Sequence, residues 1–302
     1  MTALSGIVLE RDGAVYRVST GQGEVRAVLR GKIKRDTPKV VVGDVVTLDQ
    51  DAGSGEMLGI AAVAERKTLL ERRVPEGRGN RPVAANIDQV LVVTASRDPA
   101  PIPQLIDRLL VVAEANHLPA AVVVNKIDLD AGPALVARFR KAGYEVLPTC
   151  VKTGAGLEAL RERVQGRVSV VTGPSGAGKS SLLNMLQPGL RLRVGEISHR
   201  VRRGKNTTVS AVMHPLAIGG FVVDTPGFSE VGLWGLDPRE LASCFPEFRP
   251  MIGECRFQDC RHMSEPGCAI IAGVAAGAVD LDRLESFRVL LAELESAPEE
   301  WE

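Results

Sequence analysis

A glycine-rich stretch with a clear chemical meaning begins at Gly173. It reads Gly173-Pro174-Ser175-Gly176-Ala177-Gly178-Lys179-Ser180. This fits the pattern of a phosphate-binding loop, and it stands between an apolar β-branched run and a helix-like run, as such a loop requires. Glycines let backbone N–H groups wrap phosphate oxygens, the lysine neutralises those oxygens, and the serine hydroxyl can bind Mg²⁺. We predict that this loop and Ser181 bind a nucleotide, with Lys179 catalytic and Ser180 a magnesium ligand. A chance glycine-rich turn is the alternative.

A second motif, Asn125-Lys126-Ile127-Asp128, follows the apolar run 121–124 and could select the base. It resembles the NKxD motif of GTPases, in which the aspartate accepts hydrogen bonds from N1 and the 2-amino group of guanine. Adenine would leave a buried carboxylate unpaired, so such a site discriminates strongly. Taken alone, the motif could be a strand-end turn that caps a helix. Cys150-Val151-Lys152 falls where many GTPases have a Ser-Ala-Lys cradle. The residues predicted to bind guanine are Asn125, Lys126, Asp128, Cys150, Val151 and Lys152.

Two further segments could sense the γ-phosphate. Asp224-Thr225-Pro226-Gly227 resembles the DxxG element that holds magnesium in GTPases, so we predict a catalytic Asp224 and a nucleotide-binding Gly227. In the basic loop Gly204-Lys205-Asn206-Thr207-Thr208, we predict that Thr208 closes over the magnesium ion as a ligand and catalytic group. The motifs therefore run from base motif through base cradle, P-loop and switch threonine to DxxG. Ordinary GTPases begin with the P-loop, so this order predicts a circular permutation.

A cysteine and histidine cluster follows, with the spacing C-x4-C-x-H-x5-C. Its members are Cys255, Cys260, His262 and Cys268. Three thiolates and an imidazole form a closed tetrahedral set that suits one structural zinc ion and leaves no position for a catalytic water. Buried free cysteines beside a surface histidine are the alternative. The surrounding loops can build little core, whereas zinc could contribute on the order of 10 kcal/mol of folding free energy, which favours the metal. The remaining cysteines, Cys150 and Cys244, are predicted to be buried.

The elements that must position these motifs fall into three parts. Short alternating runs from Gly6 to about Leu48 predict four or five strands of an OB-like β-barrel. The barrel's basic turn, 30–35, either binds RNA or is a solvated hairpin. The polar stretch 75–82 predicts a linker.

Beyond that linker, apolar runs alternate with amphipathic stretches such as 106–115 and 157–164, which predicts a parallel α/β sheet with helices on both faces. After Ser229 the sequence becomes loop-rich and then helical from Leu281 to Leu294. We predict an OB-fold RNA-binding domain over 1–70, a circularly permuted P-loop GTPase domain over 80–230 and a mostly helical zinc-binding domain over 231–302.

Composition excludes little. Lysine plus arginine equals aspartate plus glutamate at 37 each in 302 residues, so net charge predicts no partner. Local charge is uneven, because the segment from Gln187 to Ser210 has six basic residues and one acid, whereas the tail from Asp280 to Glu302 has eight acids and two arginines. No apolar run approaches the roughly 20 residues that span a bilayer. The N-terminus lacks a signal-peptide pattern, so a cytoplasmic protein without membrane contact is expected.

Together these motifs resemble the ribosome small-subunit-dependent GTPase A family, which combines an OB domain, a permuted G domain and a zinc domain. The resemblance extends over nearly the whole chain. The motifs that carry it, beyond those above, are Arg30-Gly31-Lys32, Val42-Gly43-Asp44 and Asn86-Ile87-Asp88-Gln89. It implies a GTPase that binds the small (30S) ribosomal subunit and its rRNA in the GTP form, assists late maturation, and leaves after hydrolysis to GDP. A monomer is expected.

The group that orients the attacking water is not evident from the sequence. Phe228 stands where a Ras-like enzyme has glutamine, and Asn206 where many family members have histidine. Asparagine can hydrogen-bond a water but cannot take up a proton at neutral pH, so Asn206 is a catalytic candidate only. Slow intrinsic turnover, accelerated by the subunit, is predicted. Two alternatives are a P-loop kinase or ATPase, which Asn125 and Asp128 disfavour, and a nucleotide-sensing RNA-binding scaffold that barely hydrolyses.

Overall fold

The N-terminal part of the chain is a closed five-stranded barrel. The computed structural model describes residues 4–29, 39–49, 57–72, 81–187, 189, 211–224, 233 and 236–296. The barrel strands are β1 (Leu4–Asp12), β2 (Val15–Thr20), β3 (Gly23–Leu29), β4 (Val45–Asp49) and β5 (Leu58–Val63). They pair in the order β1-β2-β3-β5-β4, and β4 returns to β1, which closes the sheet. Alternate side chains such as Tyr16, Val18 and Ile60 fill the interior. The predicted barrel is confirmed.

Two details of the barrel differ from the sequence prediction. Its fifth strand is β5, which lies beyond the stretch that the alternation marked. Residues 40–46 fall within the stretch from Gly6 to Leu48 that predicts strands, but they do not form one strand. Residues 40–42 precede β4 as a buried segment, and Val42 bridges to Ala84 outside the barrel. The basic turn 30–35 lies outside the described residues.

A small antiparallel sheet connects the barrel to the central part of the chain. It consists of β6 (Leu69–Arg72) and β7 (Arg81–Ala85). Arg81 and Pro82, predicted as the end of a linker, are therefore strand residues. A buried ion pair lies next to this sheet, where the Arg66 guanidinium donates to Asp44 at 2.7 Å. Asp44 lies just before β4 and Arg66 just before β6, so this pair ties the barrel to the small sheet.

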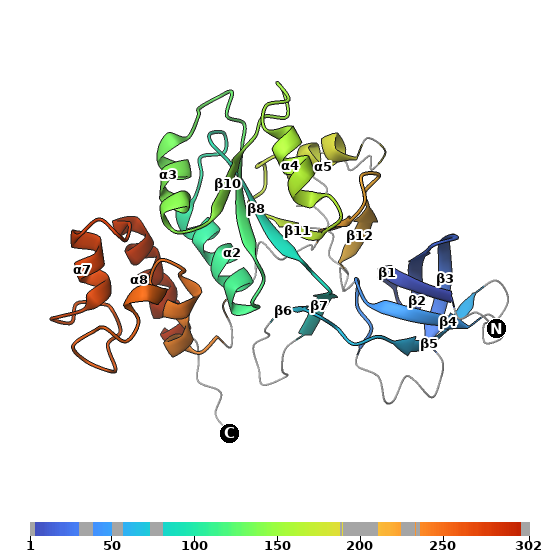
Figure 1. The fold of residues 1–302 in the computed structure, drawn as a ribbon, viewed down its shortest axis with the longest axis horizontal. Coiled ribbons are helices and arrows are strands. Elements are labelled where there is room, and N and C mark those ends of the chain that lie inside the picture. The colour runs from blue at the N-terminus through green and yellow to red at the C-terminus, as the bar shows by residue number, and fades with distance from the viewer. Residues whose placement is uncertain are drawn as a thin grey trace.

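The central part is a parallel sheet covered on both faces (Figure 1). Its strands are β8 (Gln89–Ala95), β9 (Ala120–Asn125), β10 (Glu145–Pro148), β11 (Val168–Thr172) and β13 (Phe221–Asp224), in the order β10-β9-β8-β11-β13. The strand β12 (Val212–Pro215) lies between β13 and β1 in the sheet and is antiparallel to both. All seven residues of β8 are buried, as a strand covered on both faces must be.

Four helices provide that cover. They are α2 (Pro103–Ala115), α3 (Pro133–Lys141), α4 (Leu157–Val164) and α5 (Lys179–Leu186). Val90 and Val92 of β8 pack in one cluster with residues of α2 and α3, whereas Leu91 and Val93 pack with residues of α4 and α5. This alternation confirms the predicted helices on both faces.

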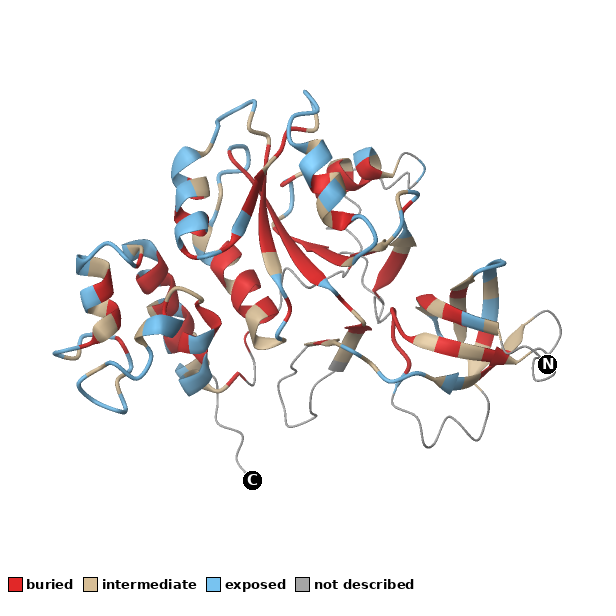
Figure 2. Cartoon of the chain, in the orientation of Figure 1, coloured by how far each residue is buried: buried red, intermediate tan, exposed pale blue. Residues whose placement is uncertain are grey.

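The C-terminal lobe, residues 236–296, is mostly helical and lies beside α2 and α3, at the opposite end of the molecule from the barrel (Figure 1). Its elements are the 3-10 helices η3 (Pro238–Cys244) and η4 (Arg249–Met251) and the α-helices α7 (Ala269–Ala275) and α8 (Leu281–Ser296). At its centre Phe245 stacks on Phe248 and both meet the ring of Phe287 edge-on, with ring centroids 4.9 to 5.5 Å apart. Its buried apolar residues belong to the same cluster as those on the α2 side of the sheet, and Figure 2 shows buried stretches both in the lobe and in α2. Among the described residues, no helix is both long and apolar enough to cross a membrane.

Candidate functional site

The glycine-rich loop connects β11 to α5 at the carboxyl edge of the parallel sheet. Gly173 has φ +138°, and a Cβ atom there would lie 1.9 Å from the Val93 carbonyl oxygen. Gly178 has φ +94°, and a Cβ there would lie 2.2 Å from Asn125 Nδ2. No side chain fits either position, because both the space and the backbone conformation exclude one. The loop thus approaches its neighbours with bare backbone and ends at the first turn of α5, the arrangement that binds phosphate.

Lys179 starts α5 with a nearly buried side chain, 5% exposed. Its Nζ donates to the carbonyl oxygens of Gly173 and Pro174, both at 2.8 Å. Burial lowers the pKa of Lys179 to about 8, while the negative charge of Asp224 acts in the opposite direction. The ammonium is therefore held inside the loop, where further negative charge would be strongly favoured. Ser180, 6% exposed, follows it in the same turn.

The base motif is tied directly to the phosphate-binding loop. Asn125 ends β9, and its Nδ2 donates to the Ala177 carbonyl oxygen at 3.0 Å. The Thr149 hydroxyl donates to Asn125 Oδ1 at 3.4 Å. The bond from Asn125 to Ala177 thus joins the base motif to the phosphate-binding loop, 52 residues further along the chain. The side chain of Asn125 therefore has a structural role at this site.

Asp128 and the predicted base cradle meet in the structure. The Cys150 thiol donates to Asp128 Oδ1 at 3.1 Å, and Lys152 Nζ lies 4.0 Å from Asp128 Oδ2. Cys150 is buried, Lys152 is exposed, and Val151 packs against the α4 and α5 side of the core. Cys150 stands where many GTPases have the serine of this cradle, and its thiol contacts the Asp128 carboxylate as a serine hydroxyl could.

The predicted switch residues are only partly described. Asp224 ends β13 opposite Val171 in register and is 8% exposed. It lies close enough to Lys179 for its charge to affect the pKa of that lysine. Asn206, Thr208, Gly227 and Phe228 lie outside the described residues.

The four predicted metal ligands converge in the C-terminal lobe. Their ligand atoms all lie within 4.8 Å of one another. His262 Nδ1 lies 3.6 Å from the sulfurs of Cys255 and Cys260 and 3.4 Å from that of Cys268. Two ligands about 2.3 Å from one ion at a tetrahedral angle are separated by about 3.8 Å, so the four residues fit a tetrahedral ion. Burial lowers the pKa of His262, which favours the neutral imidazole that a metal requires.

Comparisons with known proteins agree with this geometry. The model of the RsgA GTPase family matches residues 63–234. A small ribosomal subunit biogenesis GTPase RsgA from Gemmatimonas aurantiaca is 50% identical over 301 residues, which cover 97% of this chain and 98% of the relative. This chain belongs to the RsgA GTPase family. The RsgA protein of Moorella thermoacetica is 39% identical, with 96% of this chain and 97% of that relative covered.

Solved structures of related proteins have the same overall architecture. YjeQ from Thermotoga maritima matches with a TM-score of 0.80 and 33% identity over 98% of this chain and 100% of its own. YloQ, described as a circularly permuted GTPase, matches with a TM-score of 0.77 and 25% identity over 99% of this chain and 98% of its own. The permuted α/β fold predicted from the motif order, and a P-loop enzyme that hydrolyses GTP, are confirmed for this member of the RsgA GTPase family.

Sequence reasoning missed the segment 96–99, which touches both the base motif and the phosphate-binding loop. Ser96 Oγ donates to the Lys126 carbonyl oxygen at 2.8 Å, and the Asp98 carbonyl accepts a hydrogen bond from Lys126 Nζ. One signal was available. The segment follows an apolar strand, as the Asn125 and Asp224 motifs do, and carboxyl ends of parallel strands share an edge.

Proposed function

We propose that this protein is a GTPase that binds the small (30S) ribosomal subunit and assists its late maturation. In this proposal it hydrolyses GTP to GDP and phosphate, and the subunit stimulates turnover and release. One observation carries the nucleotide part, namely that the Asp128 carboxylate and the Lys179 ammonium occupy the same edge of the sheet, joined through Asn125. The names of relatives up to 50% identical support the ribosomal part.

The proposed roles of the site residues follow their positions. Asp128 reads guanine with Asn125, Lys126 and the cradle 150–152, while the loop 173–181 and Gly227 bind the phosphates. Lys179, Asp224, Thr208 and Asn206 are the proposed catalytic groups. Ser180 and Thr208 would hold Mg²⁺, which neutralises charge on the phosphates when bound. Cys255, Cys260, His262 and Cys268 would hold one structural zinc ion.

The proposed division into parts assigns RNA contact to the two ends of the molecule. Residues 1–70 form the OB domain, 80–230 the permuted GTPase domain and 231–302 the zinc domain. The outer two would contact rRNA, since they flank the GTPase domain in the chain and lie at opposite ends of the molecule. We further propose a cytoplasmic monomer without membrane contact.

A hydrolysis assay with purified subunits tests the proposal. GTP turnover is measured alone, with small subunits and with large subunits, at low salt, and a Lys179→Met variant reports contaminating activity. Stimulation by the small subunit alone is expected. An equal rate in all three mixtures would contradict the ribosomal role. GTP-dependent binding to small subunits without stimulated turnover would favour a nucleotide-sensing scaffold instead.

A further inference from the structure

The segment Ser96-Arg97-Asp98-Pro99 continues β8 beyond Ala95 and leads to α2. It belongs to none of the nucleotide-binding motifs described above. The Ser96 amide donates to the Asn125 carbonyl oxygen at 2.8 Å, which extends the pairing between β8 and β9 by one more bond. The segment therefore starts beside the base motif.

Lys126 is held by this segment at both ends. The Ser96 hydroxyl donates to its carbonyl oxygen at 2.8 Å, and its ammonium donates to the Asp98 carbonyl oxygen. Ser96 is nearly buried at 8% exposure, so water does not readily replace its hydroxyl in this bond. The first contact holds the backbone of the turn that ends in Asp128, and the second holds the Lys126 side chain.

That turn needs such support because Lys126 has φ +64°. This left-handed conformation is routine for glycine and occasional for asparagine or aspartate, but not for lysine. Two backbone hydrogen bonds also support this turn, from the Leu129 amide to the Lys126 carbonyl oxygen at 2.9 Å and from the Ile127 amide to the Thr149 carbonyl oxygen at 3.3 Å. Loss of the Ser96 bond would therefore loosen the turn, and the direction of Asp128 two residues later would vary more.

The same segment also contacts the phosphate-binding loop. A Cβ atom on Gly176 would lie 3.2 Å from Pro99 Cδ. Residues 96–99 therefore lie against the base motif at one end and the loop at the other. They therefore link the base motif to the phosphate-binding loop.

We propose that Ser96 is a positioning residue for guanine recognition. Its hydroxyl holds Lys126 in the left-handed turn and so aims the Asp128 carboxylate at the base. This inference rests on the proposed function, because it assumes that Asp128 reads guanine. It predicts an effect on nucleotide affinity and base selectivity, with no group of Ser96 entering the chemical step.

The test compares Ser96→Ala and Ser96→Thr with a control, Ser169→Ala. Ser169 is fully buried on β11 and accepts a hydrogen bond from Gln89 at 2.8 Å, but it lies at the start of its strand, far from the loop. Dissociation constants for GTP, GDP, ITP and ATP, together with kcat, KM and the thermal midpoint, are measured for each protein. ITP lacks the 2-amino group of guanine, so the ratio of GTP to ITP affinity reports the aim of Asp128.

For Ser96→Ala we expect GTP and GDP to bind about fivefold more weakly, as the loss of one buried hydrogen bond implies. KM should rise with kcat retained, because ground-state and transition-state binding fall together. The GTP over ITP preference should shrink. Ser96→Thr should keep both affinity and preference, and Ser169→Ala should lose only stability.

An unchanged GTP over ITP preference in Ser96→Ala would overturn the inference. The inference would also fail if Ser169→Ala had the same thermal midpoint as Ser96→Ala and lost as much affinity for GTP. If the wild-type protein itself failed to prefer GTP over ATP, the proposed function would fail, and that result is read before any variant is compared.

Discussion

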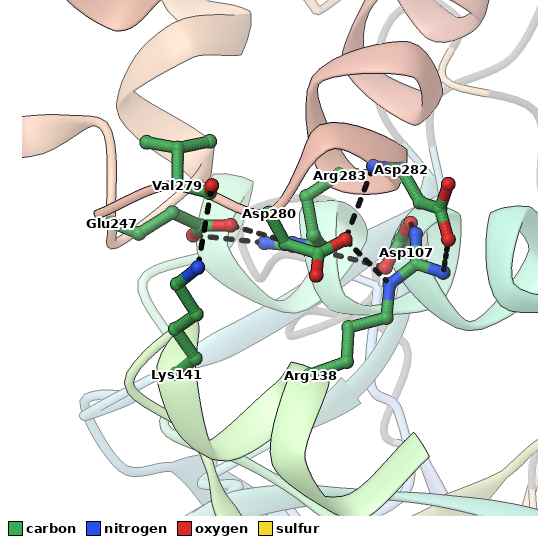
Figure 3. A network of polar contacts seen from close by, with 8 residues as sticks. All are labelled: Asp107, Arg138, Lys141, Glu247, Val279, Asp280, Asp282 and Arg283. Carbon is green, nitrogen blue, oxygen red and sulfur yellow. Dashed lines mark hydrogen bonds and ion pairs between the residues drawn. The ribbon is translucent and has the colours of Figure 1, made fainter. Parts of the chain in front are cut away.

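The Arg283 guanidinium of α8 donates to the Asp107 carboxylate of α2 at 2.7 Å, and both side chains are fully buried. Figure 3 shows the surrounding network, in which Arg283 also reaches Glu247 at 2.6 and 3.0 Å and Arg138 of α3 reaches Asp107 at 3.4 Å. Burial disfavours the charge of Arg283, but Glu247 and Asp107 more than offset it and raise its pKa above the ordinary value. The network fastens the C-terminal lobe to the two helices on one face of the sheet.

Loss of Arg283 should therefore destabilise the protein. Arg283→Met leaves Asp107 and Glu247 buried without their main counter-ion, which implies a loss of about 3–5 kcal/mol in the free energy of unfolding. Urea unfolding followed by circular dichroism measures it. Arg239→Ala, which breaks an exposed pair with Asp237, is the matched control and should change nothing measurable. Equal stability of the two variants would show that the buried network contributes little.

A side chain at Gly178 should disrupt nucleotide binding. In Gly178→Ala the new Cβ would meet Asn125 Nδ2, so either the loop or Asn125 must move. Strain of this kind costs of order 1–3 kcal/mol, and we expect GTP affinity to fall by about tenfold or more. Gly166→Ala is the control, because Gly166 is also left-handed, at φ +69°, but has open space around its Cβ position. Comparable affinity of both variants for a fluorescent GTP analogue would argue against the close approach.

The lowered pKa of Lys179 predicts proton uptake on binding. The value near 8 in the free protein lies below that of an ordinary lysine, so the free form loses its proton as the pH rises through 8. Phosphate oxygens raise the pKa again, and GDP binding must then take up a proton and weaken with increasing pH. Calorimetry in two buffers of different ionisation enthalpy should show roughly no uptake at pH 7 and most of one proton at pH 8.5.

The control for this titration is Lys179→Arg, whose guanidinium stays charged throughout the range. Its uptake should be the same at both pH values. If the wild-type protein also took up equal numbers of protons at pH 7 and pH 8.5, the buried and partly neutral state of Lys179 would be wrong.

Removal of one sulfur should empty the zinc site that we propose. Cys260→Ser is expected to reduce bound zinc from about one ion per chain to a small fraction and to lower the thermal midpoint, because a closed site stabilises the fold around it. Cys244→Ser is the matched control, since Cys244 is buried in the same lobe but outside the cluster. Zinc content is measured by atomic absorption. A wild-type protein without zinc, and a Cys260→Ser variant with the thermal midpoint of wild type, would contradict the site.

Local patterns predicted much of this molecule and failed where distant contacts decide. Helix α4 occupies the residues that the amphipathic run marked, 157–164, because burial of Leu160 and Val164 follows the helical period. Val42 looked like a barrel strand residue, but the turn at Gly43 directs it towards β7 instead. A Cβ on Gly43 would lie 2.0 Å from the Ala85 carbonyl oxygen.

The network around Arg283 could not have been predicted from local sequence. Arg283 and Asp107 are 176 positions apart, and each reads as an ordinary charged residue on a helix. The same holds for Ser96, whose positioning role depends on the left-handed backbone of Lys126. Motifs specify the groups that touch a nucleotide, whereas the residues that hold those groups are found only when the fold is known.

The most direct measurement of the central claim is the base selectivity of an Asp128→Asn variant. An asparagine can donate to the 2-oxo group of xanthine but no longer accepts both guanine hydrogen bonds, so preference should move from GTP to XTP. Competition binding of GTP and XTP to wild type and variant measures the change. The matched control is Asp130→Asn, the same change at an exposed carboxylate that accepts a hydrogen bond from the Gly132 amide, and it should keep the preference for GTP. If Asp128→Asn bound GTP as tightly as wild type and ignored XTP, the assignment of this edge of the sheet as a guanine-nucleotide site would be wrong.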